Sequence, residues 1–429
     1  MKLCFLLLLF SPLPSIISLV SPPSFTTHLR PPTSLNSILP NPLVAEIKMS
    51  ATVELFSKVK AMEAEGKKVT SLCVGEPDFP PPQVVLDELV NAISSGQTTY
   101  TAVTGTEELR SAIAADLLKR KHLQYKSTEI LVSNGAKQSV YQGVFAICGP
   151  GDEVIIPAPY WPSYPEMVAL TGATPVILPT TIEDEFLVNP KALAAAITPK
   201  TKMIIFCNPS NPSGAVHSAS LMSEIADVIR DYPQLAVLSD EIYERLVYNP
   251  SNPHVSFASL PGMYDRTLTV NGFSKAYAMT GLRLGYMAAP ANLLKPCITI
   301  QSQLTSCASS ISQAAGVAAL TKVQESEMEA NVEIMRKKRD YVLSKLAAMP
   351  DVKSFTPDGA FYVLPDVSAY YDGDDATLCL DLLENKALAL VPGSSFGAPG
   401  TIRISYATSQ EELEIAMQKL GDFLKESRQ

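Results

Sequence analysis

The sequence lacks the residue patterns that build disulfide frameworks, structural zinc sites and nucleic-acid surfaces. Its seven cysteines are scattered without a Cys-x-x-Cys spacing, and its four histidines are equally dispersed. An odd, scattered set of cysteines argues against a disulfide framework and against a bound metal, and free thiols suit a reducing compartment. Acidic residues outnumber basic ones by 43 to 34, which gives a net charge of -9 and no basic face for a nucleic acid.

Acidic residues are also missing from the first 45 positions. This segment has a short apolar run at residues 3–10 and then a stretch rich in Ser, Thr and Pro at residues 21–43. The apolar run is shorter than the ~20 residues that a membrane-spanning helix needs, so we expect no membrane attachment of the mature form. A signal-peptide core and an acid-free, hydroxyl-rich segment are both typical of targeting sequences.

Residues 1–45 are therefore predicted to be a presequence in two parts. They resemble the presequences of algae with secondary plastids, in which the transit part often opens at a Phe, and Phe25 fits that place. The resemblance implies the plastid stroma as the location. The secretory pathway is the alternative, and the scattered free cysteines favour the stroma over an oxidising lumen.

From about residue 53, helical patterns alternate with short apolar runs. The runs that predict buried strands are 130–132, 153–156, 175–178, 203–207, 235–239 and 267–270. Such alternation predicts an α/β fold with a mostly parallel sheet covered on both faces. After about residue 312, one long helix (Ser312–Met349), short strands and a last helix predict a smaller α+β domain. We expect an N-terminal segment (46–80) that joins this small domain (313–429), and a large domain between them (81–312).

Lys275 lies just beyond a predicted buried strand, between small residues. Desolvation and neighbouring cations depress the pKa of such an amine and make it a nucleophile. Arg283 follows eight positions later, and its planar fork matches phosphate oxygens. The alternative is a lysine at a strand edge that pairs with an acid.

Other polar groups follow the ends of the same predicted strands. Asp240 could pair with a protonated pyridine nitrogen, or simply cap a helix. The run 133–138 starts a helix where backbone N–H groups could bind phosphate, or is only a capped helix. The run 208–214 is a rigid double Asn-Pro segment or a plain turn. Trp161, the single Trp, could stack on a flat ring or belong to the core.

Seven motifs in order make a resemblance plain, from about residue 45 to the end of the chain. They are Gly75-Glu76-Pro77-Asp78-Phe79 and the runs 133–138, 158–161, 208–214, 239–243, 271–286 and 403–408. The chain resembles the fold-type I enzymes that use pyridoxal 5'-phosphate (PLP). Within them it is similar to the prokaryotic-type aspartate aminotransferases of plastids, some of which also transaminate prephenate. This implies a mostly parallel seven-stranded sheet in a large PLP-binding domain, and a homodimer with shared active sites.

The resemblance also implies roles for individual residues. Lys275 would carry the cofactor as an imine and later move the proton in catalysis. Asp240 would pair with the pyridine nitrogen, Tyr243 and Asn211 would hold the ring oxygen, and Trp161 would stack on the ring. The phosphate would be surrounded by Gly135, Ala136, Lys137, Ser274 and Arg283, with Tyr100 from the neighbouring subunit. The substrate α-carboxylate would be bound by Arg403 with Gly75, Trp161 and Asn211.

Substrate choice depends on fewer residues. In the resembled subgroup, Lys137 would bind the distal carboxylate of a dicarboxylic amino acid, and Thr52 stands where prephenate users keep a threonine. Leu282 and Thr99 depart from the usual Trp and basic residue of that subgroup. The sequence therefore predicts amino-group transfer between aspartate or glutamate and 2-oxo acids, with prephenate as a further substrate. The alternatives are an aromatic, alanine or kynurenine aminotransferase and a catalytically silent binding protein of the same fold.

Overall fold

The computed structural model describes residues 41–45, 47 and 51–427. The chain divides into two compact units, residues 1–45 and 46–429. Only a short helix, α1 (Pro42–Ala45), is described in the first unit, so Phe25 and most of the expected presequence lie outside the described residues. Within the described residues, no helix combines the length and the apolar character that a bilayer crossing requires.

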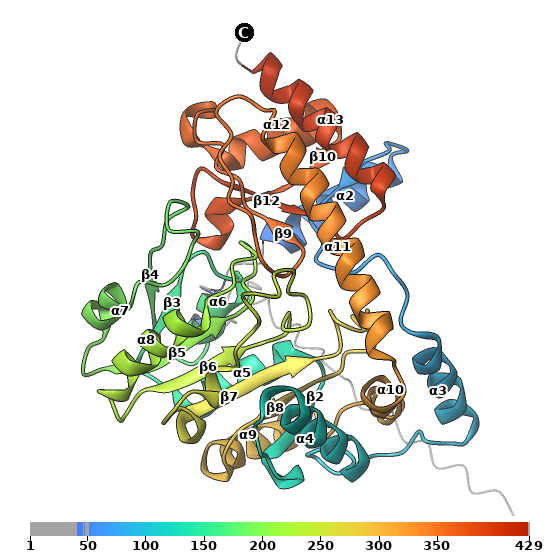
Figure 1. Ribbon diagram of the computed structural model, residues 1–429, viewed down its shortest axis with the longest axis vertical. Coiled ribbons are helices and arrows are strands. Elements are labelled where there is room, and N and C mark those ends of the chain that lie inside the picture. Colours follow the sequence, from blue (N-terminus) through green and yellow to red (C-terminus); the bar gives the residue numbers. More distant parts are fainter. Residues whose placement is uncertain (1–40, 46, 48–50, 428–429) are drawn as a thin grey trace, which may run out of the picture. The chain divides into compact units, whose positions relative to one another are not determined.

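The largest sheet among the described residues has seven strands and lies in the lower half of Figure 1. Its strands lie in the order β2-β8-β7-β6-β5-β3-β4. Only β8 runs against its neighbours. The strands are β2 (Ile130–Ser133), β3 (Glu153–Pro157), β4 (Thr174–Leu178), β5 (Thr201–Cys207), β6 (Ala236–Asp240), β7 (Thr267–Gly272) and β8 (Gly285–Ala288). Their nearly continuous apolar runs suit burial on both faces, and this confirms the predicted fold class.

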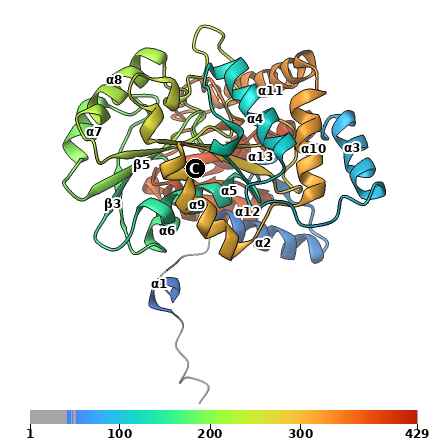
Figure 2. The ribbon, with the colours of Figure 1, turned by 90° about the horizontal axis from the view of Figure 1, so that it is seen from below.

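Helices cover both faces of this sheet. One face packs against α5 (Ala136–Ile147), α6 (Ser163–Ala169) and α9 (Ala291–Leu304). The other face packs against α4 (Glu107–Lys121), α7 (Pro190–Ala196), α8 (Ala219–Arg230) and α10 (Ser310–Thr321). Figure 2 shows α7 and α8 across the strands from α6 and α9. α3 (Gln83–Ser94) packs against α10.

A second group of elements is built from both ends of the unit. The strands β9 (Tyr362–Val363), β11 (Val391–Pro392) and β12 (Ile402–Ser405) form a three-stranded antiparallel sheet. β1 (Thr70–Ser71) pairs in parallel with β10 (Leu388–Ala389), which joins the N-terminal segment to this group. The accompanying helices are α2 (Ala51–Ala64), α11 (Glu325–Leu346), α12 (Asp375–Lys386) and α13 (Gln410–Glu426). The domain boundaries expected at residues 80 and 312 stay predictions.

The prediction of a single long helix over Ser312–Met349 is wrong. Two helices, α10 and α11, cover this stretch and are separated at residues 322–324. The break precedes Glu325 and Glu327, whose charges stabilise the N-terminal turn of a new helix. Glu325, the first residue of α11, also pairs with Arg245 at 3.1 Å.

Candidate active site

The carboxyl ends of neighbouring parallel strands bring the predicted residues to one edge of the sheet. Asp240 is the last residue of β6, and Lys275 comes three residues after the end of β7. Asn208 follows β5, the next strand on the other side of β6. Because the three strands are parallel, their carboxyl ends bring these three residues to the same edge of the sheet. Ligands bind beyond this edge in open α/β sheets.

Lys275 has the surroundings of a reactive amine. Its Nζ donates a hydrogen bond to the Gly75 carbonyl and lies 5.9 Å from the centroid of the Tyr243 ring. Burial lowers the pKa of Lys275 to about 8, opposed by Glu76 and assisted by Arg403. An amine that loses its proton near neutral pH can attack a carbonyl carbon.

Asp240 is buried, with an exposed fraction of 4%. The Tyr164 hydroxyl donates to its Oδ2 at 2.7 Å, and the Ile242 N–H donates to its Oδ1 at 3.2 Å. Burial raises the pKa of Asp240 to about 6, and the two donors oppose this rise. A buried carboxylate at this place is suited to pair with a protonated ring nitrogen.

The start of α5 forms a cradle for an anion. Gly135 precedes the helix with a φ of 87° and supplies no side-chain cap, so the first backbone N–H groups stay available. A Cβ atom on Gly135 would lie 2.5 Å from Nη2 of Arg283, and one on Gly285 would lie 2.3 Å from the Ala136 nitrogen. Ser274, buried beside Lys275, completes the predicted phosphate set. Backbone donors at a helix start and a guanidinium together favour a phosphate group.

Arg403 lies in β12 and reaches the same site from the second group of elements. It is buried, and its Nη1 donates to Asn211 Oδ1 at 3.1 Å while its Nη2 donates to the Cys73 carbonyl at 2.5 Å. Its Nε is buried without a hydrogen-bond partner. A buried, unpaired guanidinium donor costs free energy, so it indicates a place for an anionic ligand such as a carboxylate.

The remaining predicted residues differ in their burial and in their contacts. Trp161 is partly buried, and the Nζ of Lys137, an exposed residue, lies 5.1 Å from the centroid of its indole ring. Although the Lys137 side chain is exposed, the partial burial of its ammonium group and the neighbouring Arg283 lower its pKa. Tyr100 is 90% exposed and takes no part in the site within its own chain. Thr52 belongs to α2, but its side chain lies outside the described residues.

Three site residues were not predicted from the sequence. Tyr164 lies one helical turn after Trp161 and reaches Asp240. Tyr362 and Phe396 place their rings 4.7 and 4.8 Å from Arg403 Cζ, measured to the ring centroids. The aromatic pair Phe361-Tyr362 in a short strand was visible in the sequence, but the pattern indicates only burial and not the neighbour across the sheet.

These features fit pyridoxal phosphate. The site offers an amine of lowered pKa, a buried carboxylate and a helix start with an arginine, which match the aldehyde, the ring nitrogen and the phosphate of that molecule. The buried Arg403 Nε adds a place for a carboxylate beside it.

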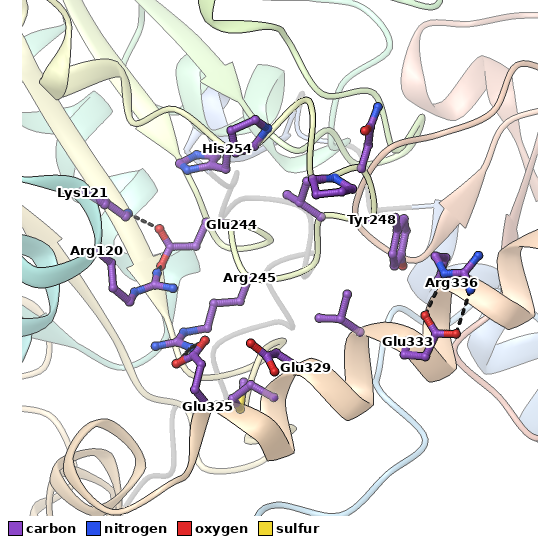
Figure 3. Close-up of a pocket in the computed structure, with 16 residues that line it drawn as sticks. Arg120, Lys121, Glu244, Arg245, Tyr248, His254, Glu325, Glu329, Glu333 and Arg336 are labelled. Atoms are coloured by element: carbon purple, nitrogen blue, oxygen red, sulfur yellow. Dashed lines mark hydrogen bonds and ion pairs between the residues drawn. The ribbon is translucent and has the colours of Figure 1, made fainter.

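A separate cavity of about 430 Å³ lies between the end of α4 and the start of α11 (Figure 3). Glu244 pairs there with both Arg120 and Lys121. Glu241, Glu244 and His254 lie close enough to hold a metal ion, but the Lys121 ammonium already pairs with both carboxylates. Ion pairs of this kind tie the two helices to the segment after β6.

Known proteins resemble this chain over most of its length. The family described as "Aminotransferase class I and II" matches residues 67–420. A protein of Petunia hybrida named bifunctional aspartate aminotransferase and glutamate/aspartate-prephenate aminotransferase is 49% identical over 391 residues, covering 89% of this chain and 81% of the relative. The aspartate/prephenate aminotransferase of Cereibacter sphaeroides is 41% identical over 389 residues, covering 89% and 97%.

Solved structures agree with this fold. The aspartate aminotransferase of Rhizobium meliloti matches with a TM-score of 0.86 at 40% identity, covering 90% of this chain and 99% of that structure. The aspartate aminotransferase of Thermus thermophilus with maleate matches with a TM-score of 0.86 at 36% identity, covering 90% and 100%.

Proposed function

The chain belongs to the aminotransferase class I and II family, and on that premise we propose that it moves an amino group between aspartate or glutamate and 2-oxo acids, prephenate included. The observation that carries this proposal is the meeting of Lys275, Asp240 and Arg403 at one edge of the sheet. PLP supplies an aldehyde that condenses with the amino group and a ring that absorbs carbanion density.

The chain's own residues then have distinct tasks. Lys275 Nζ, with its lowered pKa, can both release and accept a proton near neutral pH, as one base serving two proton transfers must. Asp240 would keep a proton on the ring nitrogen of PLP through its negative charge, and Tyr164 orients that carboxylate. The α5 start and Arg283 would hold the phosphate end of PLP.

Two cations divide the recognition of a dicarboxylic substrate. Arg403 is held by Asn211 and the Cys73 carbonyl, and it would bind the α-carboxylate bidentately. Lys137, an exposed residue whose ammonium lies 5.1 Å from the centroid of the Trp161 ring, would bind the distal carboxylate. The Petunia and Cereibacter relatives are named for aspartate and prephenate, and this supports both as substrates of this chain.

The proposal includes a homodimer in the plastid stroma. Tyr100 is largely exposed in its own chain, which suits a side chain that completes the phosphate site of a neighbouring subunit. The acid-free composition of residues 1–45 supports the plastid. A fluorescent protein fused behind residues 1–45 tests the location, and secretion of the fusion would favour the alternative pathway.

A panel of amino donors and oxo acceptors tests the proposed function. Aspartate and glutamate as donors, with 2-oxoglutarate, oxaloacetate and prephenate as acceptors, should give higher kcat/KM than alanine, kynurenine or aromatic donors. Preference for an apolar or aromatic donor would favour the alternative aminotransferases. PLP binding without turnover of any pair would favour a silent binding protein.

A further inference from the structure

Tyr362 is a buried tyrosine that contacts two parts of the proposed site. It lies in β9, and its exposed fraction is 1%. In the antiparallel pair of β9 and β12, Tyr362 lies opposite Ser405, two residues from Arg403 on the same face of the strand. Arg403 is thus its diagonal cross-strand neighbour, which is within reach of an aromatic ring.

The Tyr362 ring supports the guanidinium of Arg403. The Cζ atom of Arg403 lies 4.7 Å from the centroid of this ring. A second ring, Phe396, lies at 4.8 Å. The two rings limit the movement of the guanidinium. Its N–H groups donate to Asn211 and to the Cys73 carbonyl, and its Nε has no hydrogen-bond partner. A planar cation held over aromatic rings is oriented before any ligand arrives.

The Tyr362 hydroxyl meets Tyr243 on its other side. The two hydroxyl oxygens are 2.9 Å apart, and either can donate. Burial raises the pKa of both phenols, so each keeps its single hydrogen at neutral pH. Tyr243 can donate to a ligand oxygen only when it accepts, and does not donate, in its bond with Tyr362.

We propose that Tyr362 is a positioning residue: its ring orients Arg403 for the substrate carboxylate, and its hydroxyl donates to Tyr243 so that the Tyr243 hydrogen points to the cofactor. The inference rests on the proposed function. In this proposal, one side chain contacts both Arg403 at the substrate end of the site and Tyr243 at the cofactor end. Hydrogen bonds in a chain polarise one another. A donor to the Tyr243 oxygen therefore strengthens the hydrogen bond that Tyr243 itself donates.

Two substitutions separate the ring from the hydroxyl. Tyr362→Phe keeps the ring and removes the hydroxyl, and Tyr362→Met keeps an apolar side chain and removes both. Tyr370→Phe is the matched control, because Tyr370 is buried in the same hydrophobic core and its hydroxyl donates to the Pro350 carbonyl at 2.6 Å. Thermal unfolding of each holoenzyme checks that the variants fold.

Two readouts are independent of turnover. The first is the dissociation constant of maleate, an unreactive dicarboxylate, measured by calorimetry on the holoenzyme. The second is the pH at which the change in visible absorption of the enzyme-bound PLP is half complete, called the midpoint below. Tyr362→Phe should bind maleate within about twofold of wild type and raise the midpoint by about 0.5 pH unit, because Tyr243 donates more weakly to the deprotonated form. Tyr362→Met should raise the midpoint similarly and weaken maleate about tenfold.

The controls distinguish failure of the inference from failure of the proposed function. Wild type and Tyr370→Phe should bind maleate alike and share one midpoint. An unchanged midpoint in folded Tyr362→Phe, or unchanged maleate affinity in folded Tyr362→Met, would overturn the inference while the proposed function stands. A wild-type protein that neither takes up PLP nor binds maleate would overturn the proposed function itself.

Discussion

The Tyr164 hydroxyl donates to Oδ2 of Asp240 at 2.7 Å, and both side chains are buried. The bond holds the carboxylate in place and opposes the rise in its pKa that burial causes. In the proposed function, the negative charge that would keep the ring nitrogen protonated therefore depends on Tyr164, three residues after Trp161.

Tyr164→Phe should lower kcat by roughly tenfold or more, since a buried hydrogen bond to a charged group contributes about 1.5–3 kcal/mol. The loss should grow as the pH falls toward 6, because the pKa of Asp240 rises further without this donor and the carboxylate protonates. Steady-state rates from pH 6 to 9 measure this effect. Tyr264→Phe, which removes an exposed hydroxyl bonded to the Gln124 carbonyl, is the control. Identical pH profiles for the two variants would contradict the role of Tyr164.

Lys137→Ala should reduce kcat/KM for aspartate about 10- to 100-fold and affect alanine much less. The physical reason is the loss of a charge-assisted bond to the distal carboxylate, which alanine lacks. Rates with both donors on one enzyme preparation provide the internal control. Equal losses for both donors would leave Lys137 as a residue of the phosphate loop only.

Gly75→Ala should disrupt the site by crowding. The new Cβ would lie 2.0 Å from the Tyr362 hydroxyl oxygen and 3.1 Å from Cζ of the same ring. We expect a loss of stability of about 1–3 kcal/mol together with weaker binding of maleate. Gly149→Ala, whose Cβ would meet nothing within 4 Å, is the matched control in thermal unfolding and calorimetry. A variant at Gly75 that is as stable as the control would show that Tyr362 moves freely.

The uptake of PLP by the apo protein should depend on pH through Lys275. Burial lowers its pKa to about 8, and only the neutral amine reacts. The rate constant of uptake should rise about tenfold per pH unit below pH 8 and level off above it. The lowered pKa of Lys275 also makes the stability of the apo protein depend on pH. Below pH 8, burial of the charged lysine lowers stability by its full amount. Between pH 8 and 10.5 the unfolded chain holds a proton that the folded chain has lost, so stability rises with pH over this range.

Stopped-flow absorption at several pH values measures this uptake. A rate that continues to rise to pH 10.5 would contradict the lowered pKa, because that is the behaviour of an ordinary lysine amine.

Much of the fold could be predicted because its signals are local. The strands that precede Asp240 and Lys275 are short apolar runs, and their position at one sheet edge follows from parallel pairing. The antiparallel strand β8 was not predicted. It is only four residues long and begins with Gly285, and glycine is depleted in strands.

The parts that escaped prediction depend on contacts far apart in sequence. Glu325, the first residue after the helix break, pairs with Arg245, which lies 80 positions away. Tyr362 and Tyr243 are separated by 119 positions, and only the packing of β9 against the segment after β6 brings their hydroxyls together. A motif indicates which side chains carry chemistry, whereas the residues that orient them are chosen by the tertiary structure.

Lys275→Ala tests the central claim most directly. The variant should fold and still bind PLP through the phosphate cradle, but without the covalent bond, so the yellow absorption band and turnover of aspartate should both be lost. Lys200→Ala, an exposed lysine in the loop before β5, is the control and should keep both. A Lys275→Ala protein that retains the yellow band and transfers amino groups at the wild-type rate would contradict the account.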